Sequence, residues 1–115
     1  MRQITKEAVN KFLQGENYSK NNTQVWSGYE CSPQRITKLF LHGNLIAQRS
    51  AYGLTIITNS GWFSNTTKER LNGLLENLGF DKIYQKKFKW YLMDKPWNGN
   101  PVRLITGHYR TWEYV

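Results

Sequence analysis

The chain has 115 residues, of which 39% are hydrophobic, 21% charged and 15% aromatic. This length suits one domain with one modest core, and the balance of residues excludes a disordered chain. Sixteen Lys and Arg against eight Asp and Glu give a formal net charge of +8. This charge favours an acidic partner, such as nucleic acid, a nucleotide or an acidic protein face, and it excludes a mimic of DNA.

The single cysteine, Cys31, leaves no pair for an internal disulfide. A reducing compartment is therefore expected. No apolar run approaches the roughly 18 residues of a membrane span, and the first residues lack the apolar segment of a signal peptide. We expect a cytoplasmic protein with no membrane association.

The first elements follow from local spacing. Thr5 is predicted to cap a helix that Gly15 ends, because apolar residues recur at helical spacing between them. These residues are Ala8, Val9, Phe12 and Leu13. The polar segment 16–22 is expected to be a loop, and Thr23–Tyr29 a short strand.

The clearest hairpin is Ile36–Arg49, in which two β-rich arms flank Gly43-Asn44, a pair suited to a two-residue turn. If that pair sets the register, Lys38 lies directly opposite Arg49 on one face. Leu39, Leu41 and Ile46 then share one face, and Phe40, Leu45 and Ala47 share the other. A hairpin that is apolar on both faces is expected at the centre of its sheet. Leu54–Thr58 is expected to form the next strand.

The second helix is predicted by the segment Thr66–Glu69, which reads as a capping box with Thr66 as N-cap and Glu69 reaching back. Four leucines follow on one stripe, and Gly79 supplies a left-handed end. These leucines are Leu71, Leu74, Leu75 and Leu78. This helix is expected to be the main clamp on the sheet.

The segment Lys82–Leu92 interleaves four lysines with four aromatic residues, and we expect a hairpin that turns at Lys86-Lys87. Val102–Ile105 and His108–Val115 look like strands. The chain is thus predicted to be a single α+β domain over residues 1–115, with a small antiparallel sheet and two helices packed on one face.

Several segments resemble a family of short phage-encoded hypothetical proteins. They are Lys6–Leu13, Asn22–Val25, Leu39–Ala47, Gly61–Asn72, Gln85–Lys87, Trp90–Leu92 and Trp97–Gly99. The chain departs from the pattern at Cys31–Gln34 and after Gly99. The resemblance implies a phage gene product that acts in the bacterial host cytoplasm. It brings no catalytic residues, and small accessory phage proteins often bind DNA or disarm a host defence system.

No catalytic, metal or cofactor site is predicted. Cys31, His42 and His108 show no ligand spacing and no nucleophile–base arrangement. No two carboxylates are spaced for acid–base work, and the glycines form no phosphate-binding fingerprint. We therefore expect a protein that is not an enzyme and that uses no cofactor.

The candidate nucleic-acid or anion site combines cations with one aromatic residue that a base could stack on. Its residues are Lys38, Arg49, Lys82, Lys86, Lys87, Lys89 and Tyr91. Strand alternation groups Lys87, Lys89 and Tyr91 on one face, and it places Tyr84, Phe88 and Trp90 against the second helix. The alternative is an ordinary solvated edge that lysines guard against pairing. Lys38 and Arg49 would then splay into water, and Arg35 would stack on Tyr52.

Three functions remain open from the sequence. The first is binding of nucleic acid, or of a nucleic-acid-associated host factor, through a basic, aromatic-bearing sheet face. The second is an anti-defence inhibitor, for example one like an anti-CRISPR protein, with exposed Trp and Tyr as anchors. The third is a sponge for a small nucleotide signal, which needs a closed basic pocket. The sequence leaves open the target, the oligomeric state, and whether Trp97 and Trp112 are core or exposed.

Overall fold

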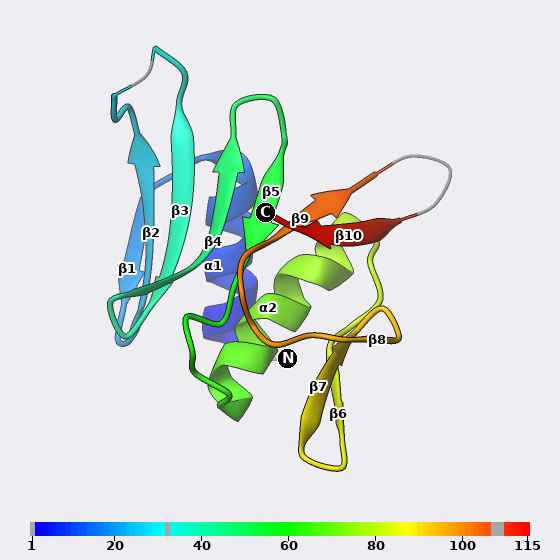
Figure 1. Cartoon of the computed structure of the whole chain (residues 1–115). Helices are drawn as coiled ribbons and strands as arrows, with labels where there is room; N and C mark the ends of the chain where they lie inside the picture. The colour runs from blue at the N-terminus through cyan, green and yellow to red at the C-terminus, as the bar shows by residue number, and fades with distance from the viewer. Residues whose placement is uncertain (1, 32, 107–109) are drawn as a thin grey trace.

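The computed structural model describes residues 2–31, 33–106 and 110–115. Over these residues the chain forms two helices and ten strands (Figure 1). The helices are α1 (Gln3–Gln14) and α2 (Asn65–Leu78). The strands are β1 (Tyr18–Lys20), β2 (Thr23–Gly28), β3 (Ile36–Leu41), β4 (Asn44–Ser50), β5 (Thr55–Ile57), β6 (Tyr84–Lys86), β7 (Lys89–Leu92), β8 (Lys95–Pro96), β9 (Val102–Ile105) and β10 (Thr111–Tyr114).

The strands of the described residues form two sheets in which every pairing is antiparallel. A seven-stranded sheet has the order β1-β2-β3-β4-β5-β9-β10, and a separate three-stranded sheet has the order β6-β7-β8. The α+β class is as predicted, but the main sheet is larger than the small sheet expected. One reason is β1, which lies in the polar segment 16–22 that was expected to be a loop.

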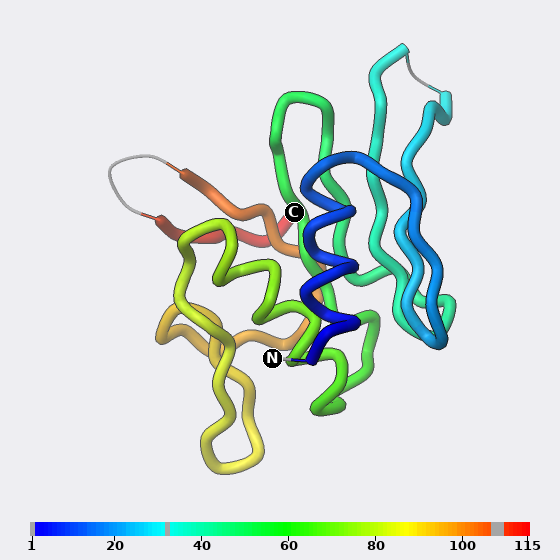
Figure 2. Tube along the Cα trace, turned by 180° about the vertical axis from the view of Figure 1, so that it is seen from behind, coloured from blue at the N-terminus to red at the C-terminus, as the bar shows by residue number. Residues whose placement is uncertain are grey.

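The core lies between the main sheet and the helices. Viewed from behind, α1 and α2 both lie in front of the strands (Figure 2). The helices contact each other, α1 contacts β1, β2 and β3, and α2 contacts β4. The β3–β4 hairpin is central in the sheet, as its two apolar faces predicted. Trp97 and Trp112 are buried, which answers the question that the sequence left open.

The helix α1 begins earlier than predicted. Its N-cap is Arg2, which makes no side-chain capping bond, so Thr5 is not the cap. The end at Gly15 is as predicted, because this residue adopts a left-handed φ of 71° and its N–H bonds back to the last turn. Ala8, Val9 and Phe12 face the core.

The helix α2 also begins before the predicted residue. Ser64 is the N-cap, and its Oγ accepts a hydrogen bond from the backbone N–H of Thr67 at 3.1 Å. The predicted capping box at Thr66 and Glu69 is therefore wrong, because Glu69 lies beyond the first turn. The leucine stripe and the left-handed Gly79 are confirmed, and Leu71, Leu74 and Leu75 have no exposed surface.

Glu69 instead belongs to a polar junction, which we define as Thr5, Glu69 and Arg70 with their partners Arg2 and Thr23. The buried Arg70 guanidinium donates to Thr23 Oγ1 at 3.1 Å, to Thr5 Oγ1 at 2.6 Å and to Glu69 Oε1 at 2.6 Å. Thr5 and Arg2 also donate to Glu69, at 2.7 and 3.0 Å. The junction ties α1, α2 and β2 together, since each supplies a partner.

The pKa values at the junction follow from these contacts. Burial disfavours the charged form of both Glu69 and Arg70. For Glu69, burial would raise the pKa, but the hydrogen bonds from Thr5 and Arg2 and the nearby guanidinium groups outweigh it, and its pKa is lowered. For Arg70, burial and the charge of Arg2 lower the pKa.

The β3–β4 register differs from the prediction. Lys38 pairs with Gln48 and Arg49 pairs with Thr37, because the register shifts between Leu39 and Phe40 and the turn forms at His42-Gly43. Side chains one position apart on a strand point to opposite faces. Lys38 therefore lies on the helix-free face, whereas Arg49 lies on the face that the helices cover. The two cations do not face each other.

The β6–β7 hairpin turns at Lys87-Phe88, one residue after the predicted pair. Its register places Lys86 opposite Lys89 and Tyr84 opposite Tyr91. The predicted grouping of Tyr84 with Phe88 and Trp90 is wrong, because strand alternation does not continue through a two-residue turn and opposed residues share a face. Trp90 alone of those three is buried. In both views this hairpin projects away from the rest of the molecule (Figures 1 and 2).

Candidate nucleic-acid interface

The tip of the β6–β7 hairpin carries the densest charge among the predicted site residues. We call Lys86, Lys87, Phe88 and Lys89 the tip. All four are exposed, and Phe88 is 95% exposed. Lys86 and Lys89 lie directly opposite each other, an arrangement that disfavours the hairpin by roughly 0.2–1 kcal/mol when both are charged. Within the described part of the chain, none of the three lysines pairs with a carboxylate.

The backbone of the tip is strained. Lys87 and Phe88 adopt φ values of 51° and 67°, the conformation that a primed turn requires of both central residues. Asn and Gly tolerate this conformation, whereas other residues cost about 1–2 kcal/mol each. Keeping a lysine and an exposed phenylalanine at this turn therefore costs backbone free energy. Strain of this kind is concentrated at functional sites.

Three of the remaining predicted site residues lie elsewhere and have protein partners. Lys38 Nζ pairs with Glu30 at 2.8 Å on the helix-free face of the main sheet. Arg49 NH1 donates to Thr55 Oγ1 at 2.7 Å on the helix-covered face. Lys82, which precedes β6, lies 3.6 Å from Glu76 of α2. The structure thus does not bring these cations to the tip.

Tyr91 lies close to the tip but is half-buried. Its ring stacks on Tyr84, with the ring centroids 5.2 Å apart and the planes 9° from parallel. The Tyr84 hydroxyl donates to Asp94 at 3.0 Å, and this bond raises the pKa of Tyr84. Elsewhere, Arg35 lies 5.6 Å from the ring centroid of Tyr29. The cation–π partner predicted for Arg35, Tyr52, is therefore the wrong aromatic residue.

An aromatic groove adjoins the tip. It is a hollow of about 440 Å³ between the small sheet, the segment before α2 and β10. Its lining residues are Phe63, Phe88, Lys89, Trp90, Pro96, Trp97, Asn98 and Tyr114. The described residues that line the groove include one cation and no carboxylate. A second hollow of about 400 Å³ shares Asn98 and Tyr114 with it and is also lined by Asn100, Pro101 and Val115.

The groove has a rigid floor and exposed walls. Trp90 and Trp97 are buried, with their ring centroids 6.1 Å apart, and they form the floor. Phe63, Phe88 and Tyr114 are exposed and form the walls. Phe63 meets Trp90 edge to face at 5.1 Å, which fixes the orientation of that wall.

Hydrogen bonds hold the floor in place. The indole N–H of Trp97 donates to the Asn100 carbonyl at 2.9 Å, and its backbone N–H donates to the Trp90 carbonyl at 3.0 Å. The loop that carries Trp97 is also bonded to Asn59, which follows β5. The backbone N–H of Asn59 donates to the Gly99 carbonyl at 3.0 Å. Gly99 has a φ of 86°, and a Cβ there would overlap the Asn59 amide. Only glycine allows this close approach.

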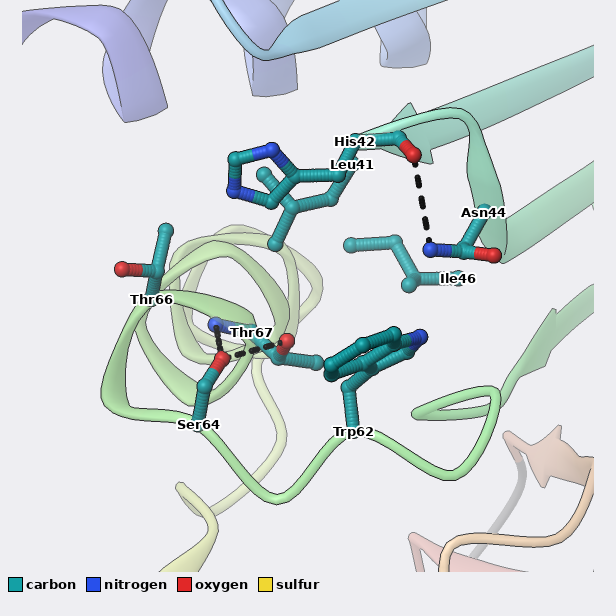
Figure 3. Close-up of a pocket in the computed structure, with 8 residues that line it drawn as sticks. All are labelled: Leu41, His42, Asn44, Ile46, Trp62, Ser64, Thr66 and Thr67. Atoms are coloured by element: carbon teal, nitrogen blue, oxygen red, sulfur yellow. Dashed lines mark hydrogen bonds between the residues drawn. The ribbon is translucent and has the colours of Figure 1, made fainter.

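A separate hollow of about 340 Å³ lies between the β3–β4 turn and the start of α2 (Figure 3). Trp62 and the aliphatic side chains of Leu41 and Ile46 line it beside the capping residue Ser64. His42, with φ 52°, is in the turn, as its predicted place at the hairpin end implied. No Lys or Arg of the described chain lines this hollow, so it lacks the basic lining that a nucleotide sponge requires.

Sequence reasoning missed the groove. Strand alternation placed Phe88 against the second helix rather than in an open groove. No local signal identifies the groove, because its walls come from segments up to about fifty residues apart. His108, which was weighed as a catalytic residue, lies outside the described residues. Across the described ranges, no group of three or more His, Cys, Asp or Glu is placed to hold a metal ion.

Neither described helix is long and apolar enough to span a membrane. A family model described as the Kyanoviridae Gp96 protein matches residues 1–111. The match includes Cys31–Gln34 and most of the segment after Gly99, the two places set apart in the resemblance. The description names a virus group and no activity, and a phage protein is made inside the infected host cell. No curated protein and no solved structure matches the chain. Since the match spans nearly the whole chain, the protein belongs to the Kyanoviridae Gp96 family of phage proteins, in agreement with the resemblance to short phage-encoded proteins.

Proposed function

We propose that this phage protein binds nucleic acid in the host cytoplasm through the tip of the β6–β7 hairpin. The observation that carries the proposal is the tip itself, where Lys86, Lys87 and Lys89 have no carboxylate partner among the described residues and Lys87 and Phe88 occupy strained backbone positions. An anion bound between Lys86 and Lys89 removes their mutual repulsion. The anions of a nucleic acid are its phosphates, and they attract a chain with a net charge of +8.

The proposed binding surface contains fewer residues than the surface expected from the sequence. Lys38, Arg49 and Lys82 already have protein partners, and the first two lie on opposite faces of the main sheet. A cation that keeps a protein carboxylate, as Lys38 and Lys82 do, releases fewer counterions when phosphate arrives, and Arg49 lies on the helix-covered face, where it donates to Thr55. We therefore assign the phosphate contacts to the tip lysines.

The test is a titration of labelled DNA at several salt concentrations. For single strands, log K falls with log salt at a slope of about −0.7 per phosphate contact. Changing Lys86, Lys87 and Lys89 to Ala should flatten that slope by roughly two units if all three touch phosphate. The matched control changes Lys6, Lys11 and Lys20 to Ala, which removes the same charge from α1 and β1. No binding by the native protein at low salt would end the proposal, and so would an equal loss in the control.

A second candidate function is inhibition of a host defence or replication protein. The observation that favours it is the exposure of large aromatic side chains, 95% for Phe88 and 58% for Trp62. Aromatic anchors dominate protein interfaces. This function predicts weak salt dependence and a greater loss on removing Phe88 than on removing the lysines. A pull-down from host lysate separates the two functions, because only an inhibitor retains one host protein after nuclease treatment.

A further inference from the structure

We propose that the aromatic groove is a binding site for the unpaired bases of single-stranded nucleic acid. This inference rests on the proposed function, and it adds a ligand class and a set of residues that the charge of the tip does not specify. The groove residues are those that form its floor and walls, namely Phe63, Phe88, Trp90, Trp97 and Tyr114, with Lys89 at its edge.

The chemistry of the lining fits a base. Every base has a flat π face, and stacking on an aromatic side chain is worth about 1–3 kcal/mol per base. Phe63, Phe88 and Tyr114 expose 55%, 95% and 47% of their surface, so their rings are available for stacking. Their exposure is not explained by the fold, because the core beneath them is already closed by Trp90 and Trp97.

The charges around the groove fit a polynucleotide backbone better than a peptide or a free apolar ligand. Lys89 lines the groove, and Lys86 and Lys87 are adjacent to it on the same tip. No Asp or Glu is found among the described lining residues. A strand whose base occupies the groove has Lys89 at the groove edge, and the other two tip lysines lie in the same four-residue turn as further partners for its phosphates. This combination of stacking surface and basic edge is the common design of single-strand binding sites.

The stacking surface of the groove favours a single strand over a duplex. A neighbouring hollow of about 400 Å³ shares Asn98 and Tyr114 with the groove of about 440 Å³. A base that is paired and stacked within a duplex has no free face to offer, and unstacking it costs a few kcal/mol. The groove thus distinguishes strands by whether their bases are open.

The rigid floor makes the site ready for its ligand. Trp97 is fixed through its indole N–H and its backbone N–H, and the loop that carries it is anchored at Asn59. A stacking platform that is already ordered loses little conformational entropy on binding. The wall residue Phe88 is held at the tip by the strained turn, which gives the strain a function.

The experiment compares Phe88→Ala and Phe63→Ala with the native protein. The probes are a labelled thymidine oligonucleotide and a duplex of the same length, each titrated at two salt concentrations. We expect each variant to bind the single strand about 5- to 150-fold more weakly, which is the stacking range converted to affinity. Duplex affinity should change less than twofold and the salt slope should stay unchanged, because the lysines remain. Tyr52→Ala, which removes an 82% exposed ring from the turn between β4 and β5, is the control and should bind like the native protein.

The outcomes separate this inference from the proposed function. If the native protein binds DNA and the lysine variant flattens the salt slope, but Phe88→Ala and Phe63→Ala bind the single strand normally, the inference fails and the proposed function stands. Equal weakening on single strand and duplex also overturns it. Loss of a host-protein contact in Phe88→Ala with unchanged DNA affinity assigns the groove to a protein instead. Phe88 is too exposed for its loss to unfold the chain, and an unchanged urea midpoint verifies this.

Discussion

The polar junction around Arg70 and the tip of the β6–β7 hairpin differ in how their charged side chains are buried and paired. At the junction, the buried guanidinium has three oxygen partners and joins α1, α2 and β2. At the tip, three lysines are exposed with no carboxylate partner in the part of the chain that the structure describes, and two of them face each other. The junction is built for stability, since a buried charge is tolerated only when it is paired and hydrogen-bonded.

The two regions also differ in which residues occupy left-handed backbone conformations. The helices of the junction end at glycines, the residues that adopt left-handed conformations without cost. The tip places Lys87 and Phe88 in that conformation, where a sequence chosen for stability would have Asn and Gly. A sequence that breaks a local rule without a structural gain indicates a functional constraint. Under the proposed function, the small sheet carries the binding and the junction beneath the large sheet carries the stability.

The largest expected effect tests the stability half of the comparison. Leu75 has no exposed surface and lies on the leucine stripe of α2. Leu75→Ala should lower the free energy of unfolding by about 2–5 kcal/mol, because it removes buried surface and leaves a cavity. The measurement is the urea midpoint. Phe88→Ala is the counterpart in the small sheet and should change it by less than about 0.5 kcal/mol. A midpoint that Leu75→Ala leaves in place would show that α2 is not the clamp.

The second prediction concerns the strain at the tip. Changing Lys87 to Asn and Phe88 to Gly should stabilise the hairpin by about 1–2 kcal/mol for each position, since the turn then has residues that suit its backbone. The measurement is hydrogen exchange of the β6 and β7 amides. The same change should weaken DNA binding, so the tip gains stability as it loses function.

The matched control for this prediction changes Lys87 and Phe88 to Ala. Alanine keeps the strain and removes the side chains, so this variant should lose binding without gaining protection from exchange. Equal protection in both variants would mean that the gain came from removing charge rather than from relieving the backbone.

Local patterns in the sequence predicted much of the fold. The leucine spacing identified α2, and the two glycine ends of the helices are as expected. The apolar faces of the β3–β4 hairpin predicted its central place. These features depend on residues within one or two turns of each other. The register of that hairpin was wrong because the turn forms at His42-Gly43 instead of Gly43-Asn44 and because an irregularity follows between Leu39 and Phe40, which no local pattern indicated.

Features that depend on distant residues could not be predicted. The partners of Glu69 at Thr5 and Arg2 are 64 and 67 residues away, so its local spacing suggested a cap instead. The sequence did predict that the tip lysines lie together in one hairpin, because they are neighbours in the chain. The aromatic groove was not predicted, because Phe63, Trp97 and Tyr114 come together only when the small sheet packs beside β10.

The smallest expected effect is a pH dependence of stability that comes from the junction and not from the tip. The pKa of Glu69 is lowered in the folded chain from its ordinary value of 4.5. Its contribution to stability is therefore complete above about pH 4.5 and is lost as the pH falls through the folded-state pKa, where the unfolded chain has already taken up a proton. Because Gln keeps the shape but carries no charge, Glu69→Gln should be less stable than the native protein at pH 7. The difference should shrink as the pH is lowered.

The measurement is the urea midpoint of both proteins between pH 7 and pH 3. Glu7 has a lowered pKa as well, through hydrogen bonds from Tyr18 and Gln3, so the variant should retain part of the native acid response. Glu16→Gln removes a surface carboxylate that pairs with Lys11 and is the control. A difference between native protein and Glu69→Gln that stays constant over this range would contradict the lowered pKa. A difference that shrinks assigns the acid response to the junction. The tip, which contains no carboxylate, would take no part in it.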